Sequence, residues 1–153
     1  MRSVDVVGAS KLTLEADDIV RSVKLLSKVQ PLHSETGAVH AAGFYIPGKG
    51  IVMAREDVGR HNALDKLAGA LARAGIDGAS GAVVVTSRVS VEMVQKTAAI
   101  GSAFIIAVSA PTALAIRTAQ EAGMTLVALV RGDDFDIFTH PDRVVCGVAK
   151  HVA

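Results

Sequence analysis

Cysteine and aromatic residues are scarce in this sequence. Its 153 residues include one cysteine, Cys146, no tryptophan, one tyrosine and four phenylalanines. A single thiol excludes an internal disulfide framework, a Cys-x-x-Cys redox pair and a cysteine-rich zinc site. We therefore expect a cytoplasmic protein, from a reducing compartment, in which Cys146 is a small core residue.

An excess of charge and an unbroken apolar run are also missing. The 16 basic and 15 acidic residues leave a formal net charge of +1, which excludes the broad basic surface of non-specific nucleic-acid binders. The longest stretch without a charged residue, residues 97–116, contains Gly-Ser and Ser-Ala-Pro-Thr breaks. It therefore predicts a helix end, a buried strand and a new helix rather than a membrane span. Acidic residues from Asp5 onward argue against a signal peptide. We expect neither a nucleic-acid partner nor a membrane association.

Aliphatic residues dominate what is present, and their spacing predicts an α/β fold. Half of the chain is hydrophobic, which suits a buried sheet covered by helices. An amphipathic helix is predicted within residues 16–29, followed by a hairpin around residues 47–50. Helices are then predicted over residues 59–75, 91–101 and 111–123, each ending at a glycine. They alternate with strands predicted over residues 81–87, 103–109, 124–131 and 135–140. This order is typical of right-handed parallel crossovers.

The length suits one domain with a real core. We divide the chain into an N-terminal segment that carries the amphipathic helix, residues 1–30, and a main domain, residues 31–153.

Parallel crossovers place the carboxyl ends of the buried strands at one sheet edge, where ligands of open α/β sheets bind. The three predicted ends read "TSRVS" (residues 86–90), "SAPT" (109–112) and "LVRGDD" (129–134). The first two lead into helices, whose free N–H groups favour anions. Ser90 and Thr112 can equally be simple helix caps. Arg88 and Arg131 are better explained by phosphate recognition. The edge is thus a candidate site for a phosphorylated or nucleotide-like ligand.

The stretch "AREDVGRHNALDK", residues 54–66, concentrates ionisable groups at the start of a predicted helix. His61 either pairs with Asp65 at i, i+4 on the helix surface or faces the site together with Arg60 and Asp57. His40 and His140 lie on or beside strands, where a lone histidine is more often structural. No serine or cysteine has the context of a hydrolytic triad.

Zinc nucleoside deaminases share this order of hairpin, helix, strand and helix. Their His-x-Glu and Pro-Cys-x-x-Cys motifs hold the metal and the general acid. Here the matching positions read His61-Asn62-Ala63 and residues 87–91, "SRVSV". One imidazole cannot hold catalytic zinc, so the architecture is plausible but its zinc chemistry is not.

Several longer motifs resemble a known family. They are "TGAVHAA" (36–42), "EDVGRHNALDK" (56–66), "TSRVSVEMVQK" (86–96), "SAPTALA" (109–115) and "FTHPDR" (138–143). Together they closely resemble the formate dehydrogenase accessory sulfurtransferase family, the FdhD proteins, over residues 30–143. The resemblance implies a cytidine-deaminase-like three-layer α/β sandwich, with a mixed, mostly parallel sheet, helices on both faces and no zinc.

The resemblance also implies a function. FdhD proteins are cytoplasmic homodimers that receive sulfur from a cysteine desulfurase. They pass it to the molybdenum or tungsten bis(molybdopterin guanine dinucleotide) cofactor of formate dehydrogenase. They bind that cofactor through its guanine nucleotide ends, so GDP serves as a mimic. The family's cofactor-binding segment matches residues 129–134 here.

One departure is serious. The family's sulfur carrier is a cysteine of a Cys-x-x-Cys motif upstream of TG-x-x-H, and the region around residues 3–6 contains no cysteine. We also expect this chain to lack the family's N-terminal domain. We therefore expect a cofactor-binding domain without a catalytic residue of its own. The alternative is a non-enzymatic dimerisation or docking module for a cysteine desulfurase or an apo-dehydrogenase.

The sequence thus offers two sets of candidate residues, and we expect no metal ligand. The pocket candidates are His40, Asp57, Arg60 and His61. The cofactor-binding candidates are Ser87, Arg88, Ser90, Ser109, Thr112, Leu129, Val130, Arg131, Gly132, Asp133 and Asp134.

Overall fold

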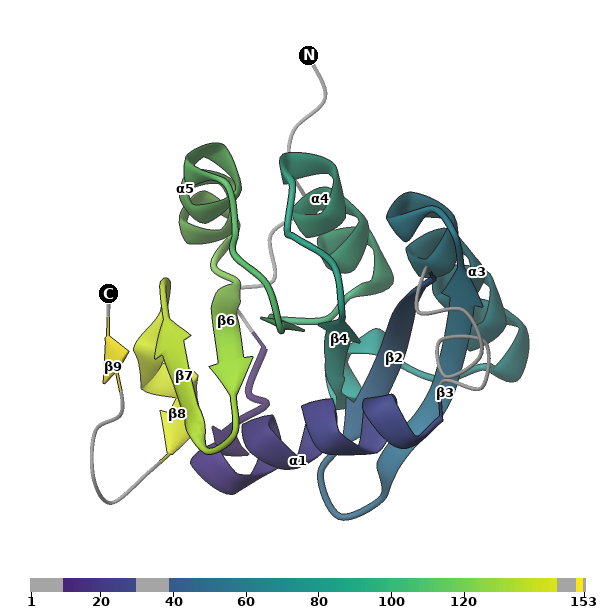
Figure 1. The fold of residues 1–153 in the computed structure, drawn as a ribbon, viewed down its shortest axis with the longest axis horizontal. Coiled ribbons are helices and arrows are strands. Elements are labelled where there is room, and N and C mark those ends of the chain that lie inside the picture. Colours follow the sequence, from purple (N-terminus) through teal and green to yellow (C-terminus); the bar gives the residue numbers. More distant parts are fainter. Residues whose placement is uncertain (1–9, 30–38, 146–150, 153) are drawn as a thin grey trace.

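A mixed seven-stranded sheet forms the middle layer of the protein (Figure 1). The structure, a computed structural model, describes residues 10–29, 39–145 and 151–152. In spatial order the strands are β3 (Gly50–Asp57), β2 (His40–Ile46), β4 (Ala82–Val85), β5 (Phe104–Ala107), β6 (Thr125–Arg131), β7 (Asp134–Ile137) and β9 (His151–Val152). Strands β4, β5 and β6 are parallel to one another, whereas β2 pairs antiparallel with β3 and with β4, and β6 pairs antiparallel with β7. A separate short pair joins β1 (Leu14–Glu15) to β8 (Val144–Val145).

Helices cover both faces of the sheet. Figure 1 shows α1 (Ala16–Lys28) below the sheet and three helices above it: α3 (Arg60–Ala74), α4 (Val91–Ile100) and α5 (Ala113–Ala122). Two short 3₁₀ helices, Gly78–Ser80 and Pro141–Arg143, lie in connections. The predicted α/β sandwich is therefore confirmed. None of the helices in the described ranges is long and apolar enough to span a bilayer.

Successive side chains of the central strands pack alternately in two separate cores, one on each face of the sheet. In β4, Val83 and Val85 pack in the core beneath α3, α4 and α5, together with Leu67. Val84 points to the other face and packs in the core beneath α1, together with Ile19. This two-sided burial explains why the strand is apolar at every position.

Glycines end three of the helices as predicted. Gly75, Gly101 and Gly123 follow α3, α4 and α5 with φ angles of 68°, 98° and 74°. This left-handed conformation suits glycine and lets backbone N–H groups bond the last helical carbonyls. The predicted domain boundary after residue 30 stays a prediction, because residues 30–38 lie outside the described part. Cys146 lies outside it as well.

A bulge changes the course of β6 near its end. Leu129 has a φ of 57°, and the register with β7 shifts between Ala128 and Arg131. Leu129 packs against the core of the α3–α5 side, whereas Val130 is buried in the core of the α1 side. Beyond the bulge the chain turns beside α1, where an Asp133 carboxylate oxygen lies 3.9 Å from Lys24 Nζ. The third strand end therefore leaves the edge that the parallel-strand argument assigned to it.

Candidate functional site

The loops that follow β4 and β5 lie side by side at one end of the sheet. The Val89 N–H donates to the Ala110 carbonyl at 3.3 Å, and the Thr112 N–H donates to the Val89 carbonyl at 3.0 Å. The third strand end reaches these loops only at its first residue, where the Leu129 N–H donates to the Ser109 carbonyl at 3.3 Å. The structure thus brings together the first two predicted strand ends and one residue of the third.

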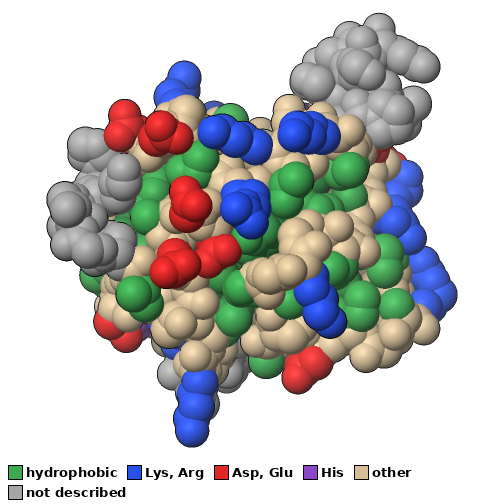
Figure 2. Space-filling model, turned by 90° about the horizontal axis from the view of Figure 1, so that it is seen from below, with side chains coloured by type: hydrophobic (Ala, Val, Ile, Leu, Met, Phe, Trp, Pro, Cys, Tyr) green, Lys and Arg blue, Asp and Glu red, His purple; other side chains and the backbone are tan. Residues whose placement is uncertain are grey.

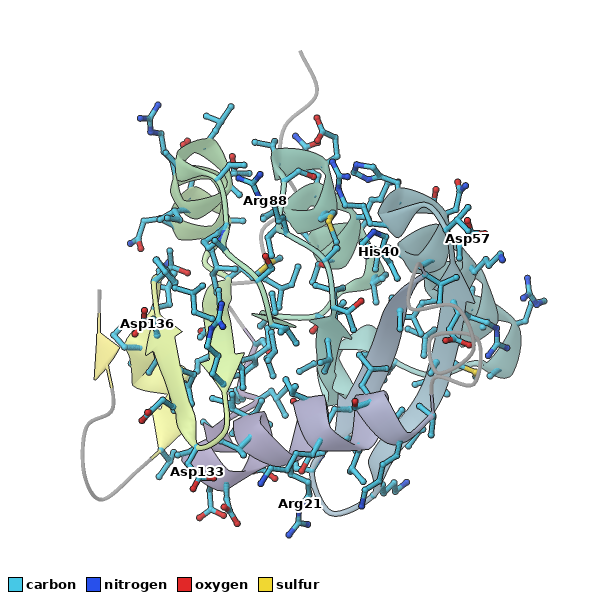
Figure 3. All side chains as sticks on the ribbon, in the orientation of Figure 1. Arg21, His40, Asp57, Arg88, Asp133 and Asp136 are labelled. Atoms are coloured by element: carbon cyan, nitrogen blue, oxygen red, sulfur yellow. The ribbon has the colours of Figure 1, made fainter. Side chains whose placement is uncertain are left out.

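A pocket of about 280 Å³ opens where these loops meet the start of α3. Three helices begin around it: α3 at Arg60, α4 after Ser90 and α5 after Thr112. Figure 3 shows Arg88 and His40 on the α3–α5 side of the sheet. We call this hollow the helix-start pocket, and its lining residues are His40, Arg60, Ser87, Arg88, Val89, Ser90 and Thr112.

The helix-start pocket has the chemistry of an anion site. Free N–H groups at helix N-termini and the positive end of each helix dipole favour negative charge. Arg60 and Arg88 are both exposed, so their guanidinium groups are available to a ligand at the mouth. Such a set of donors can hold phosphoryl oxygens from several directions.

The two capping residues of the pocket differ. Thr112 Oγ1 accepts the Ala115 N–H at 3.0 Å, so for this residue the cap interpretation is correct. Ser90 is the N-cap of α4 but makes no side-chain cap bond. Its Oγ is buried and has no hydrogen-bond partner within the described ranges. A buried hydroxyl without a partner is costly, and a bound ligand oxygen would satisfy it.

His61 and Glu92 lie at the starts of α3 and α4, respectively. His61 Nδ1 is buried and unpartnered among the residues that the structure describes. The Glu92 backbone N–H lowers the pKa of its own carboxylate, and the nearby Ser90 hydroxyl, His61 and Arg60 add to this effect. The Ser90 hydroxyl lies close enough to lower the pKa of Glu92, but its geometry is not that of a hydrogen bond. The alternative pairing of His61 with Asp65 is not formed, because Asp65 binds Lys96 Nζ at 3.0 Å instead.

Asp57 does not line the pocket. Its carboxylate accepts the Gly59 N–H at 2.9 Å and lies 2.7 Å from Lys66 Nζ, at the start of α3. Figure 3 places Asp57 at the outer side of α3, away from Arg88. The Gly59 N–H and then Lys66 lower its pKa to about 2. Asp57 therefore stabilises the start of α3, and of the ionisable cluster at this helix start only Arg60 lines the pocket.

The segment 129–134 is divided between the two faces of the molecule. Val130 is 4% exposed and belongs to the core, so its side chain cannot meet a ligand. Arg131 pairs in register with Asp134 at the turn into β7, and Gly132 has a φ of 58° within that turn. Asp133 lines a different hollow, next to α1.

The "FTHPDR" motif has a structural role. The buried Arg143 guanidinium donates to the Gly123 carbonyl, and a His140 ring nitrogen lies 2.9 Å from the Gln120 carbonyl oxygen. Thr139 Oγ1 donates to the Met124 carbonyl at 2.6 Å. These bonds satisfy the end of α5 and hold it to β6, so His140 is not a ligand of the helix-start pocket.

A second group of charged residues was not predicted from the sequence. Arg21, Lys24 and Lys28 line the hollow next to α1 together with Lys49. The signal was present, since the spacing i, i+3, i+7 places the first three on one face of a helix. In the described part of the chain, no group of three or more His, Cys, Asp or Glu residues is placed to hold a metal ion.

Comparison with known proteins identifies the family. The sequence model of the FdhD/NarQ family matches residues 1–145. The chain belongs to the FdhD/NarQ family. It is 59% identical over 145 residues to the "Sulfur carrier protein FdhD" of Agrobacterium fabrum, covering 95% of this chain and 54% of that protein. It is 56% identical over 130 residues to the protein of the same name from Brucella melitensis, covering 85% of this chain and 48% of that protein.

A solved structure has the same fold. A protein from Desulfotalea psychrophila, described as a formate dehydrogenase accessory protein, superposes with a TM-score of 0.85 at 30% identity. The match covers 93% of this chain and 61% of that chain. The chain thus spans about half the length of the curated FdhD relatives it matches.

Proposed function

We propose that this chain is the cofactor-binding part of an FdhD-type accessory protein for formate dehydrogenase. It binds the molybdenum or tungsten bis(molybdopterin guanine dinucleotide) cofactor as cargo, so that the cofactor can be sulfurated. Membership of the FdhD/NarQ family supports the class of function. A homodimer and a cytoplasmic location, which the resemblance implies, stay predictions.

The helix-start pocket is the observation that carries this proposal. The cofactor contains diphosphate groups, and a diphosphate needs N–H donors and guanidinium groups that converge. Three helices begin around the pocket, Arg60 and Arg88 line it, and the Ser90 Oγ among them has no partner within the described residues. A volume of about 280 Å³ is near the lower limit for small-molecule sites, which suits the phosphoryl end of a larger ligand.

The sulfur step itself requires groups outside the described residues. Persulfide transfer needs a thiolate, and Cys146 is the one cysteine of the sequence. We therefore assign binding and orientation of the cofactor to the described residues. A cysteine desulfurase as sulfur donor and formate dehydrogenase as the recipient follow from the family resemblance.

Calorimetric titration with GDP tests the proposal. The wild-type chain is expected to bind GDP, and Arg88→Ala is expected to weaken binding by about tenfold or more, because a charge-assisted contact to phosphate is lost. Arg117→Ala is the matched control, since Arg117 is an exposed arginine of α5 that does not line the pocket. No heat at millimolar GDP, or equal affinity for both variants and the wild type, would contradict the assignment.

Arg131→Ala extends the same experiment. The resemblance includes Arg131 in the cofactor segment, but the structure places it at the turn beyond the bulge. Weaker GDP binding in this variant would show that the nucleotide reaches from the pocket to the turn. Unchanged binding would confine the nucleotide to the helix-start pocket.

A further inference from the structure

A second hollow lies on the opposite side of the sheet, between α1 and the turn that joins β2 to β3. Its volume is about 560 Å³, twice that of the helix-start pocket. We call it the α1 groove and define it by Arg21, Lys24, Lys28 and Lys49 on its rim and by Val20 and Leu25 on its floor. Figure 2 shows this face: most of the acidic side chains lie on the left, while basic ones lie across the middle, along the right edge and at the bottom.

The positive charge of the groove comes from two separate elements. Arg21, Lys24 and Lys28 follow one face of α1, and Lys49 adds a fourth cation from the turn. A basic residue in the last turn of a helix is explained by the helix dipole, but that explanation does not extend to Arg21 or Lys49. Like charges one turn apart on a helix destabilise it slightly. The clustering therefore favours a binding role over a simple solvated face.

Little inside the protein neutralises these cations. Across the groove, within the described ranges, the structure shows one ion pair, between Lys24 and Asp133 at 3.9 Å. Their side chains are 62% and 86% exposed, and an ion pair at that distance and exposure contributes little. Asp17 and Asp133 are the acidic lining residues, so the groove keeps an excess of positive charge.

The groove is also preformed. Gly48 and Gly50 have φ angles of 83° and 85°, a left-handed conformation that suits glycine in the tight turn between β2 and β3. A Cβ added to Gly50 would lie 3.2 Å from Leu25 Cδ1, so the turn packs closely on the helix. Lys49 in this turn lines the groove together with the cations of α1. A ligand therefore meets an arranged surface rather than having to order it.

We propose that the α1 groove binds an acidic segment of a protein partner. Carboxylates of that segment pair with the four rim cations, and an apolar side chain rests on Val20 and Leu25. The carboxylates of Asp17 and Asp133 would repel a densely charged polyanion or an anionic membrane. A peptide can avoid this repulsion, because its acidic residues can be spaced so that none lies next to these two carboxylates. This docking surface is separate from the proposed cofactor function, since Figure 3 shows Arg21 and Asp133 below the sheet and Arg88 above it.

The test uses a short synthetic peptide of glutamate and leucine, with its glutamine counterpart as control. Amide shifts of the ¹⁵N-labelled chain should change in α1 and the β2–β3 turn with the glutamate peptide only, and binding should weaken with added salt. The double variant Lys24→Glu, Lys28→Glu should lower the affinity by about tenfold or more. The double variant Arg21→Glu, Arg117→Glu has the same change in net charge but alters only one residue of the groove. Its affinity for the glutamate peptide should therefore fall by less.

Three outcomes would overturn the proposal. One is equal binding of the glutamine peptide, and another is an equal loss in both double variants, which would mean that net charge alone acts. The third is binding to phosphatidylglycerol vesicles in place of the peptide, which would identify a membrane surface. An unchanged circular dichroism spectrum and unchanged GDP affinity show that the variants are folded, and they separate failure here from failure of the cofactor proposal.

Discussion

Ser90 and Thr112 occupy the same position, the N-cap of a helix, but only one of them makes the cap bond. Thr112 Oγ1 accepts a backbone N–H of α5, whereas the buried Ser90 Oγ has no partner in the described part. Thr112→Ala should therefore lower the free energy of unfolding by about 1 kcal/mol, the usual loss for a cap. Ser90→Ala should change it by less than about 0.5 kcal/mol, because no bond is lost.

Urea denaturation of the two variants, with and without GDP, measures this difference. Ser90→Ala should nevertheless weaken GDP binding, since the hydroxyl is expected to bond the ligand. A loss of stability in Ser90→Ala as large as that in Thr112→Ala would show that Ser90 is an ordinary cap and would remove it from the site.

Asp57 contributes to the acid stability of the protein. Its pKa in the folded protein is about 2, below the ordinary value of 3.8, because the Gly59 N–H and Lys66 favour the ionised form. Its contribution to the free energy of unfolding is therefore complete above about pH 4 and is lost as the pH falls towards 2. Asp57→Asn should lower the stability at neutral pH and flatten its dependence on pH in that window.

Thermal melts between pH 2 and pH 7 measure this effect. Asp65→Asn is the matched control, because Asp65 is a carboxylate of α3 that also pairs with a lysine, Lys96, but is 59% exposed. The same pH profile for Asp57→Asn and the wild type would contradict the role assigned to Asp57.

At the scale of elements, a buried tyrosine joins α1 to the sheet through a hydrogen bond. The Tyr45 hydroxyl of β2 donates to Asp18 Oδ1 at 2.6 Å, and Tyr45 is fully buried. Burial, followed by this bond, raises the pKa of Tyr45 well above its ordinary value, so the phenol stays a donor. Tyr45→Phe keeps the ring in the core and should lower the free energy of unfolding by about 1.5 kcal/mol, as for a bond to a charged acceptor.

Chemical denaturation checks this value, and GDP affinity is the internal control, because Tyr45 packs on the α1 side of the sheet. A change in GDP affinity would mean that α1 and the helix-start pocket are coupled. No loss of stability would mean that water replaces the bond at no cost.

The elements themselves could be predicted from the sequence because their signals are local. Glycine at the end of α3, α4 and α5 and the apolar run of β4 each depend on a few neighbouring residues. The bulge at Leu129 could not be predicted, since a positive φ in a leucine has no signature in composition or periodicity. For this reason the sequence placed residues 131–134 at the shared edge, while the structure places their turn beside α1. The role of Asp57 was missed for a similar reason, because its partners were identifiable only once the start of α3 was built.

At the scale of the whole molecule, the net charge is near zero, yet the protein has two separate basic sites. Arg60 and Arg88 lie at the helix-start pocket, and the cations of the α1 groove lie across the sheet. A formal charge of +1 therefore excludes a global field but says nothing about local ones. The sheet between them is packed on both faces, so the two sites share no side chain in the described residues.

This separation predicts independent binding. Residues that are far apart and share no partner have additive effects, so Arg88→Ala should weaken GDP binding by the same factor with or without Lys24→Glu. Lys24→Glu should likewise weaken binding of the acidic peptide by the same factor with or without Arg88→Ala. Calorimetry on the wild type, the two single variants and the double variant measures both ligands. An interaction energy above about 0.5 kcal/mol would mean that the sheet transmits a change between its faces, and docking at α1 would then regulate the cofactor site.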